Sequence, residues 1–341
     1  MEKELPTTPI DFLDLSYKLG CDELLIQGAG GNTSFKAGAC MWIKASGTRL
    51  DQALKRRIFT PVRYKTIIQN IIKSPDDLLK NSIIGENQLR PSIETTLHAI
   101  MPHKVVLHTH PVDIIALASQ KNSKLIFSKY LKNFKWAWVP YAKPGVNLSK
   151  TSQNSINGKN VDILVLENHG LVVGGNSCKE AENLTYKIMK ICKQLNRQVP
   201  LSSKYIPKSI DEYFWEKNKN ITTLATDTKS FGICKRGVLY PDQAVFLGPN
   251  IPAVNEYEEI SHYVSSQKAL LGFKPQFIVV KDIGVLIAEN ATNNISVMLN
   301  CHANILRRIN TNNALKFLSI NEIEEILNLD AEKYRQSLEQ K

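Results

Sequence analysis

Two histidines follow a short β-branched run in the segment 104–111 (KVVLHTHP). Because successive side chains of a strand point to opposite faces, His108 and His110 are expected to project from the same face. Two imidazoles at the end of one strand can bind a single ion together. Ordinary strand histidines that only make hydrogen bonds show the same spacing, so this pair alone leaves both interpretations open.

A second candidate strand ends in another histidine. The run 161–167 (VDILVLE) is followed by the turn 168–170 (NHG), in which a glycine can hold the imidazole of His169 at the rim of a sheet. Three neutral imidazoles that leave one position open are the ligand set of a catalytic zinc ion, whereas magnesium and calcium prefer oxygen ligands. The sequence therefore predicts a Zn²⁺ site of His108, His110 and His169. We assign the nearby His98 and His103 to structure.

Helical and strand-like segments alternate along the chain, which predicts an α/β fold. Helical spacing covers 9–19, 61–73, 92–100, 112–119 and 179–195, and strand-like runs cover 33–36, 40–44, 104–110, 161–167 and 171–173. The stretch 197–236 has two prolines, many lysines and asparagines and no sustained period, so we interpret it as a linker with one helix near 210–217. We expect a first domain over 1–196 and a C-terminal extension over 237–341 packed on it.

A weak internal repeat links the two parts. Residues 161–196 align with residues 275–310 at a constant offset of 114, which places Gly170 on Gly284 and His169 on Ile283. The second copy is expected to keep a strand-turn-strand-helix shape and to bind no metal. Chance similarity between two amphipathic segments explains the same pattern, so the repeat is interpreted as degenerate and partial.

Composition excludes several classes of protein. With 341 residues, of which 43% are hydrophobic, the chain can bury one or two cores, so neither a disordered chain nor a disulfide-stapled miniprotein is expected. The six cysteines are scattered without a CxxC pair, which favours reduced thiols. No apolar run reaches the ~18 residues of a membrane span, and the N-terminus lacks the apolar core of a secretion signal. We therefore expect a cytoplasmic protein that does not enter membranes.

The net charge of +11 has two interpretations. The lysines are spread along the whole chain and no cluster interleaves them with aromatic residues, so we expect no nucleic-acid partner. A solvated basic surface explains the charge. Attraction of a phosphorylated small molecule is the alternative.

Two glycine-containing turns could bind an anion. The loop 28–34 (GAGGNTS) is preceded by a helix and followed by a strand, the reverse of a dinucleotide-binding turn, so we reject that function for it. Its backbone amides can still bind a phosphate, and the segment 43–48 (IKASGT) offers a second turn for the same anion. Upstream of the histidine strand, Ser92 is expected near a helix N-cap, with Glu94 in the first turn as a proton shuttle beside the metal.

Five short motifs occur in the order and approximate spacing of a known family. They are GNTS at 31–34, KASG at 44–47, PSIE at 91–94, HTHP at 108–111 and ENHG at 167–170. Together they resemble the class II aldolase/adducin head family of zinc-dependent sugar-phosphate aldolases over residues 25–195. Within the family, 92–99 and the later segment 237–242 (GVLYPD) look most like the aldolase portion of bifunctional rhamnulose-phosphate aldolase/dehydrogenases.

The resemblance implies a three-layer α/β/α fold with a mainly antiparallel central sheet. It also implies an active site at a subunit interface and a homo-oligomer, with a tetramer favoured. By position, His108, His110 and His169 match the zinc ligands, and Glu94 matches the catalytic acid/base. Further residues match phosphate-binding positions: Asn32, Ser46, Gly47 and Ser92. Ile93 replaces a serine found in several family members, which puts the presence of phosphate on the substrate in question.

The implied reaction is reversible aldol cleavage of a ketose 1-phosphate through a metal-stabilised enediolate. An epimerase, a dehydratase or a decarboxylase would use the same site, and a non-catalytic adducin-like binding protein is a further alternative. Retention of all three histidines and Glu94 argues against the binding protein. The family's second acid/base is usually a tyrosine, and the eleven tyrosines of this chain leave that choice open.

Overall fold

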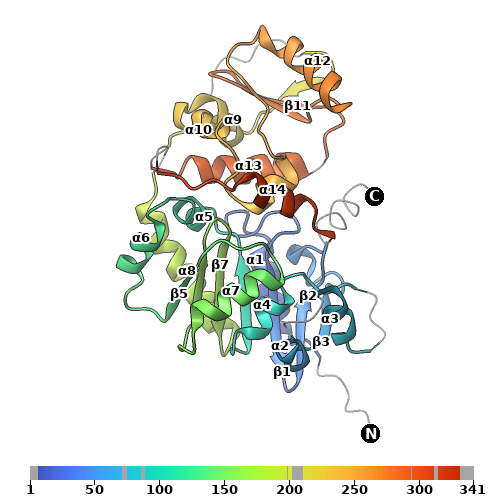
Figure 1. Cartoon of the computed structure of the whole chain (residues 1–341), viewed down its shortest axis with the longest axis vertical. Coiled ribbons are helices and arrows are strands. Elements are labelled where there is room, and N and C mark those ends of the chain that lie inside the picture. The colour runs from blue at the N-terminus through green and yellow to red at the C-terminus, as the bar shows by residue number, and fades with distance from the viewer. Residues whose placement is uncertain are drawn as a thin grey trace.

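A computed structural model describes residues 7–70, 75–85, 89–197, 199–201, 210–292, 294–310 and 314–330. The described chain forms two sheets in two stacked units, with α13 (Asn294–Leu306) and α14 (Ile320–Leu327) lying between them (Figure 1). The first sheet has seven strands in the order β3-β2-β1-β4-β7-β6-β5, and the second has four in the order β8-β11-β10-β9.

The N-terminal unit contains the strands β1 (Asn32–Ala37), β2 (Cys40–Lys44), β3 (Phe59–Arg63), β4 (Val105–Thr109), β5 (Trp136–Val139), β6 (Ile163–Leu166) and β7 (Gly170–Gly175). Its helices are α1 (Ile10–Gly20), α2 (Tyr64–Gln69), α3 (Pro75–Ser82), α4 (Thr95–Ile100), α5 (Val112–Ala118), α6 (Ser123–Tyr130), α7 (Val146–Ile156) and α8 (Cys178–Leu195). The C-terminal unit contains β8 (Tyr213–Trp215), β9 (Ala253–Val254), β10 (Phe277–Val280) and β11 (Gly284–Ala288). Its helices, besides α13 and α14, are α9 (Lys219–Thr226), α10 (Thr228–Cys234), α11 (Pro241–Leu247) and α12 (Glu259–Leu271).

The three-layer α/β/α fold and its mainly antiparallel sheet are confirmed. In the seven-stranded sheet only β5 and β6 pair in parallel. Alternate residues of β4 enter opposite layers, because Val105 and Leu107 pack with α1 and α8 whereas Val106 packs with α4 and α7. His108 continues the second series, so it lies on the α4 side of the sheet.

The C-terminal sheet repeats the topology of half of the first sheet. Shifted by 114 residues, β6 falls on β10, and the turn residue Asn168, with φ of 55°, falls on Asp282, with φ of 60°. Both hairpins are antiparallel, and each lies beside a parallel strand, β5 or β9. By register, Trp215 opposite Leu286 takes the place of His108 opposite Val172.

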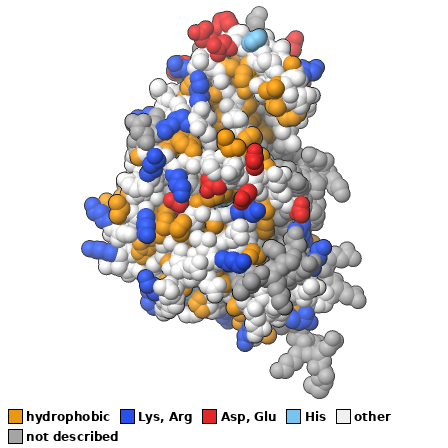
Figure 2. Space-filling view, in the orientation of Figure 1, with side chains coloured by type: hydrophobic (Ala, Val, Ile, Leu, Met, Phe, Trp, Pro, Cys, Tyr) orange, Lys and Arg blue, Asp and Glu red, His pale blue; other side chains and the backbone are white. Residues whose placement is uncertain are grey.

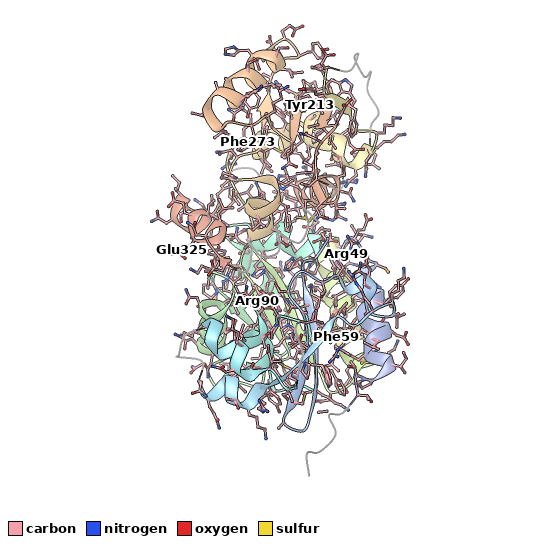
Figure 3. The ribbon with its side chains drawn as sticks, turned by 90° about the vertical axis from the view of Figure 1, so that its right-hand side faces the viewer. Arg49, Phe59, Arg90, Tyr213, Phe273 and Glu325 are labelled. Carbon is pink, nitrogen blue, oxygen red and sulfur yellow. The ribbon has the colours of Figure 1, made fainter. Side chains whose placement is uncertain are left out.

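The two units share a core at α5. Val112, Ile115 and Ala116 of this helix pack with side chains of α13 in one apolar cluster. At the edge of this contact the Arg308 Nε donates to the Asp113 Oδ1 at 2.9 Å, and the Asn196 side chain donates to the same oxygen. These contacts fix the C-terminal unit on the first sheet. In Figure 3, α14, marked by Glu325, lies beside the N-terminal unit.

Two expected helices differ from the structure. Over 61–73, Pro61 to Arg63 belong to β3, α2 follows over Tyr64–Gln69, and 71–73 lie outside the described residues. Pro61 is tolerated there because β3 is an edge strand. Near 210–217 the chain forms β8, which pairs with β11, and α9 and α10 follow within the stretch interpreted as a linker. The isolated pattern missed this strand because its partner lies about 70 residues later.

Surface and hydropathy add two observations. Within the described ranges, no helix combines the length and apolar character needed to cross a bilayer. On the face shown in Figure 2, lysine and arginine side chains are dispersed among apolar and acidic ones rather than gathered in one patch.

The Arg308–Asp113 pair allows a test of the junction. We expect Arg308→Met to lower the free energy of unfolding by about 3–5 kcal/mol, because it leaves the Asp113 carboxylate buried without its cation. Urea unfolding would measure the loss. Lys18→Met, which breaks the exposed pair with Glu182, should cost no more than ~1 kcal/mol. Equal losses in the two variants would contradict a role for the buried pair at the junction.

Candidate active site

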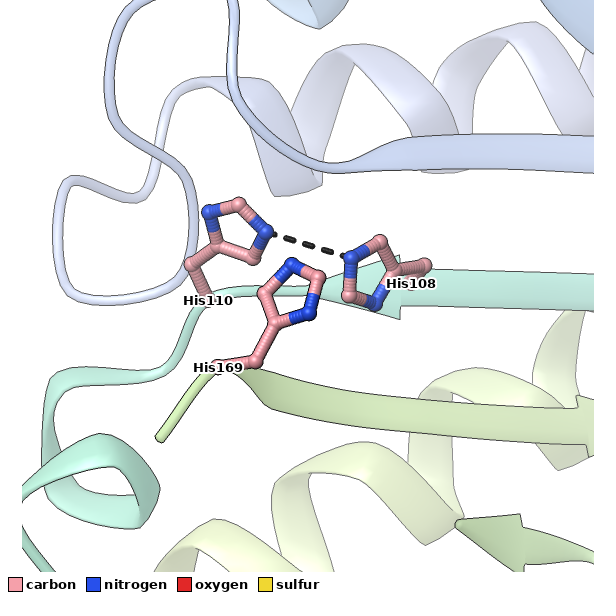
Figure 4. Close-up of side chains that lie close together, drawn as sticks. All are labelled: His108, His110 and His169. Carbon is pink, nitrogen blue, oxygen red and sulfur yellow. Dashed lines mark hydrogen bonds between the residues drawn. The ribbon is translucent and has the colours of Figure 1, made fainter. Parts of the chain in front are cut away.

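Three histidines converge where β4 and the β6–β7 turn end at the same edge of the sheet (Figure 4). One side-chain nitrogen from each of His108, His110 and His169 lies within 4.8 Å of the others, and all three residues are buried. The Nε2 atoms of His108 and His110 are 3.1 Å apart. A single metal ion could be held between these nitrogens.

The hydrogen bonds of the His108 and His110 rings determine which nitrogen of each ring faces the other histidines. The Nδ1 of His108 donates to the Leu171 carbonyl at 3.1 Å, and the Nδ1 of His110 donates to the Asp242 carboxylate at 2.9 Å. In the neutral form each Nε2 then presents a lone pair. Two such lone pairs at 3.1 Å repel one another unless a proton or a metal cation lies between them. The donor set therefore fits a cation.

Glu94 completes the cluster on the α4 side. Its Oε2 accepts from the Asn32 amide at 2.8 Å and lies 3.2 Å from the His108 Nε2, while its Oε1 lies 3.5 Å from the His169 Nε2. That Oε1 and the His169 Nδ1 are buried and have no hydrogen-bond partner among the described residues. Buried polar atoms in this state indicate that a ligand or water belongs in the site.

Burial and mutual charge set the protonation of the cluster. Burial raises the pKa of Glu94. The charge and hydrogen bond of His108, together with the charges of the other two histidines, lower this pKa by more than burial raises it, so it lies well below its usual range. Burial lowers the pKa of His169 to about 3. This imidazole is therefore neutral near pH 7, which is the form that binds metals.

The four residues expected to bind phosphate line one pocket together with Glu94, His110 and His169. These residues are Asn32, Ser46, Gly47 and Ser92. Two backbone hydrogen bonds join the segments that carry them: the Ser46 N–H donates to Arg90, and the Ser92 N–H donates to Lys44. The buried Lys44 Nζ also donates to the carbonyls of Ala29 and Thr48, which holds the glycine loop against the second turn.

The local structure at Ser92 differs from the expectation. Helix α4 begins at Thr95 with Glu94 as its N-cap, and the Ser92 hydroxyl accepts from the Glu94 N–H in the preceding turn. The Ser92 carbonyl accepts from Thr95, so this serine forms a turn of its own. A six-residue helix offers a weak dipole, and the anion pocket instead depends on the turns around Ser46 and Ser92.

Sequence reasoning missed two contributors. Asp242, from α11, lines the pocket and contacts His110 although 132 residues separate them. His98 links the Ser34 hydroxyl to the Asn32 side-chain oxygen and so orients the amide that holds Glu94. The motif at 237–242 was the only signal for Asp242. The position of His98 one helical turn after Glu94 was the signal for the second.

The sequence profile of the class II aldolase and adducin N-terminal domain family matches residues 12–195, and the chain belongs to this family. A protein of Bacillus subtilis (strain 168), named uncharacterized oxidoreductase YuxG, is 32% identical over 207 residues. The alignment covers 56% of this chain and 30% of that protein, so the chain spans about a third of the length of this curated relative.

Two solved structures are similar to part of this chain. The N-terminal class II aldolase domain of a conserved protein from Thermoplasma acidophilum is 26% identical, with a TM-score of 0.48, over 57% of this chain and 96% of that one. A sugar-phosphate aldolase from Thermotoga maritima is 18% identical, with a TM-score of 0.43, over 54% of this chain and 91% of that one.

Metal analysis tests the histidine cluster. Protein purified without added ions should contain about one divalent metal per chain, and His108→Ala or His169→Ala should remove most of it, because each change deletes one of three ligands. His262→Ala, which changes an exposed histidine of α12, should keep the metal. Equal metal content in all variants, by mass spectrometry of the purified proteins, would rule out this cluster as the binding site.

Proposed function

We propose that this chain is a zinc-dependent aldolase that reversibly cleaves a ketose 1-phosphate to dihydroxyacetone phosphate and an aldehyde. The observation that carries the proposal is the arrangement of Glu94, whose two carboxylate oxygens lie 3.2 Å and 3.5 Å from the Nε2 atoms of His108 and His169. A carboxylate beside an open metal position is suited to proton transfer on a substrate held there. Family membership supports a lyase-like enzyme.

Zinc is the proposed ion because all three ligands are nitrogen atoms, which harder ions such as magnesium do not prefer. When bound, zinc would polarise the substrate ketone and stabilise the negative charge that develops on its oxygens as the carbon–carbon bond breaks. The neutral state of His169 favours coordination without loss of a proton.

Glu94 is the proposed acid/base at the carbon that gains a proton after bond cleavage. Its depressed pKa means that it enters the condensation direction as a carboxylate, which can remove this proton. In the cleavage direction Glu94 must first take up a proton, for which the substrate hydroxyl that is deprotonated on cleavage is the proposed source, before it can protonate this carbon. The Asn32 amide holds one oxygen by donating to it, so the carboxylate is positioned by a group that does not itself titrate.

The substrate phosphate is proposed to bind at Ser46, Gly47, Ser92 and Asn32. Two of these residues lie on turns that backbone hydrogen bonds hold together, so the anion would meet a preformed pocket. Lys44 also lines this pocket and is only 2% exposed, and in its ammonium form it would add positive charge near the anion. Ile93 also lines the pocket and gives it an apolar wall where several family members have a serine. The homotetramer implied by the family resemblance is part of the same proposal.

Glu94→Gln tests the role of the carboxylate. The variant should keep its zinc and the hydrogen bond from Asn32, but lose about 10²–10⁴-fold in turnover, because the amide cannot exchange the proton. Release of dihydroxyacetone phosphate, coupled to its reduction, gives the rate. Glu182→Gln, in α8 and not among the residues that line the pocket, is the matched control. Unchanged turnover in Glu94→Gln would remove this residue from the mechanism.

A panel of ketose 1-phosphates and the corresponding free sugars tests the reaction and the phosphate pocket together. Cleavage should require the phosphate, and Ser46→Ala should raise KM about 10-fold for the phosphorylated substrate only, because it removes one hydrogen bond to a charged group. Absence of dihydroxyacetone phosphate from every substrate would contradict aldol cleavage. Conversion without carbon–carbon cleavage would instead identify an epimerase or a dehydratase.

A further inference from the structure

A carboxylate from the C-terminal unit reaches the histidine cluster of the N-terminal unit. Asp242 lies in the first turn of α11, directly after Pro241, and its Oδ2 accepts a hydrogen bond of 2.9 Å from the His110 Nδ1. Both side chains are about nine-tenths buried, at 9% exposure each. This contact crosses the boundary between the two units at the pocket that contains Glu94.

The other atoms of His110 are held by the N-terminal unit. Its backbone N–H donates to the Leu25 carbonyl at 2.9 Å, and its carbonyl accepts from the Gln27 side chain. These bonds fix the backbone and do not involve the ring. The ring's Nε2 faces His108, and its Nδ1, on the opposite side, donates to Asp242, so this hydrogen bond sets the orientation of the ring.

Gly30 leaves room for this hydrogen bond. A Cβ atom at this position would lie 3.2 Å from both the Asp242 Oδ2 and the His110 Nδ1, and 2.9 Å from the Gln27 carbonyl. Any larger residue would therefore press on the two bonded atoms from the glycine loop. The glycine loop at Gly30, the His110 ring and the Asp242 carboxylate are therefore packed against one another.

We propose that Asp242 is a positioning residue for the metal ligand His110, so that metal affinity depends on the docked C-terminal unit. The inference rests on the proposed metal-dependent function. A carboxylate that accepts from Nδ1 keeps the proton on that nitrogen, aims the Nε2 lone pair at the metal and raises the basicity of the imidazole. His108 is held in the same way, but by a carbonyl of its own unit, Leu171.

The segment that carries Asp242 has no counterpart in the first copy of the repeat. In the N-terminal unit, α6 ends at Tyr130 and β5 begins at Trp136, whereas in the C-terminal unit α10 ends at Cys234 and β9 begins at Ala253. The longer connection contains α11 and reaches back to the other unit. The contact of the C-terminal unit with His110 thus comes from this longer connection and not from the β10–β11 hairpin.

The test measures zinc affinity directly, in the full-length protein, by competition with a chromogenic chelator. We expect Asp242→Ala to weaken zinc binding by about 10–100-fold and Asp242→Asn, which keeps an oxygen acceptor but loses the charge, by a smaller factor. The visible spectrum of the Co²⁺-loaded Asp242→Ala protein should change as well, because His110 is free to reorient.

Asp227→Asn is the matched control. Asp227 also lies in the C-terminal unit, where it caps α10 and pairs with Arg197, so its loss should lower the melting temperature of the metal-free protein without changing the zinc dissociation constant. If Asp242→Ala behaves like this control, with lower stability and wild-type zinc affinity, the positioning role is overturned. Failure of the wild-type protein to bind zinc would overturn the proposed function together with it.

Discussion

The buried cluster of three imidazoles and one carboxylate is the constraint on which the rest of the site depends. His108 is fully buried, and Glu94, His110 and His169 are nearly so. Placing such groups away from water costs free energy unless each polar atom finds a partner. Asn32, Leu171 and Asp242 satisfy three positions, while the Glu94 Oε1 and the His169 Nδ1 are left without one among the described residues. A divalent cation beside the Glu94 Oε1 and the histidine Nε2 atoms would offset part of this cost, so the cluster supports the proposed metal site.

The central sheet fixes the positions of the residues in this cluster. His108 lies in β4, which pairs with β1 on one side and β7 on the other, so its backbone is held by two ladders. Asn32 is directly opposite His108 in the β1–β4 register, so the amide that holds Glu94 lies next to the histidine cluster without any long loop. Sites built on central strands vary less in geometry than sites built on loops.

Much of this was predictable from the sequence, and the reason is local. His108 and His110 share a face because side chains of a strand repeat every two residues. The turn that carries His169 begins with Asn168 at positive φ and ends at Gly170, the first residue of β7. The predicted start of the helix at Ser92 and the predicted helix from Pro61 were wrong. Helix capping and edge-strand pairing depend on partners that lie outside the local sequence pattern. Asp242 was not predictable as a partner of His110, because 132 residues separate them and only the docking of the two units brings them together.

The four-stranded sheet repeats the β4-β7-β6-β5 half of the first sheet, but the described residues contain a single histidine cluster. At the positions of His108, His110 and His169, the second half has Trp215, Lys217 and Ile283, aligned by the β8–β11 register and the offset of 114. The buried Trp215 packs near Gly284 at the start of β11, where an imidazole pair would need polar partners, so this end of the second sheet is part of its apolar core. The connection between α10 and β9 contains α11, and through Asp242 it reaches the histidine cluster of the N-terminal unit.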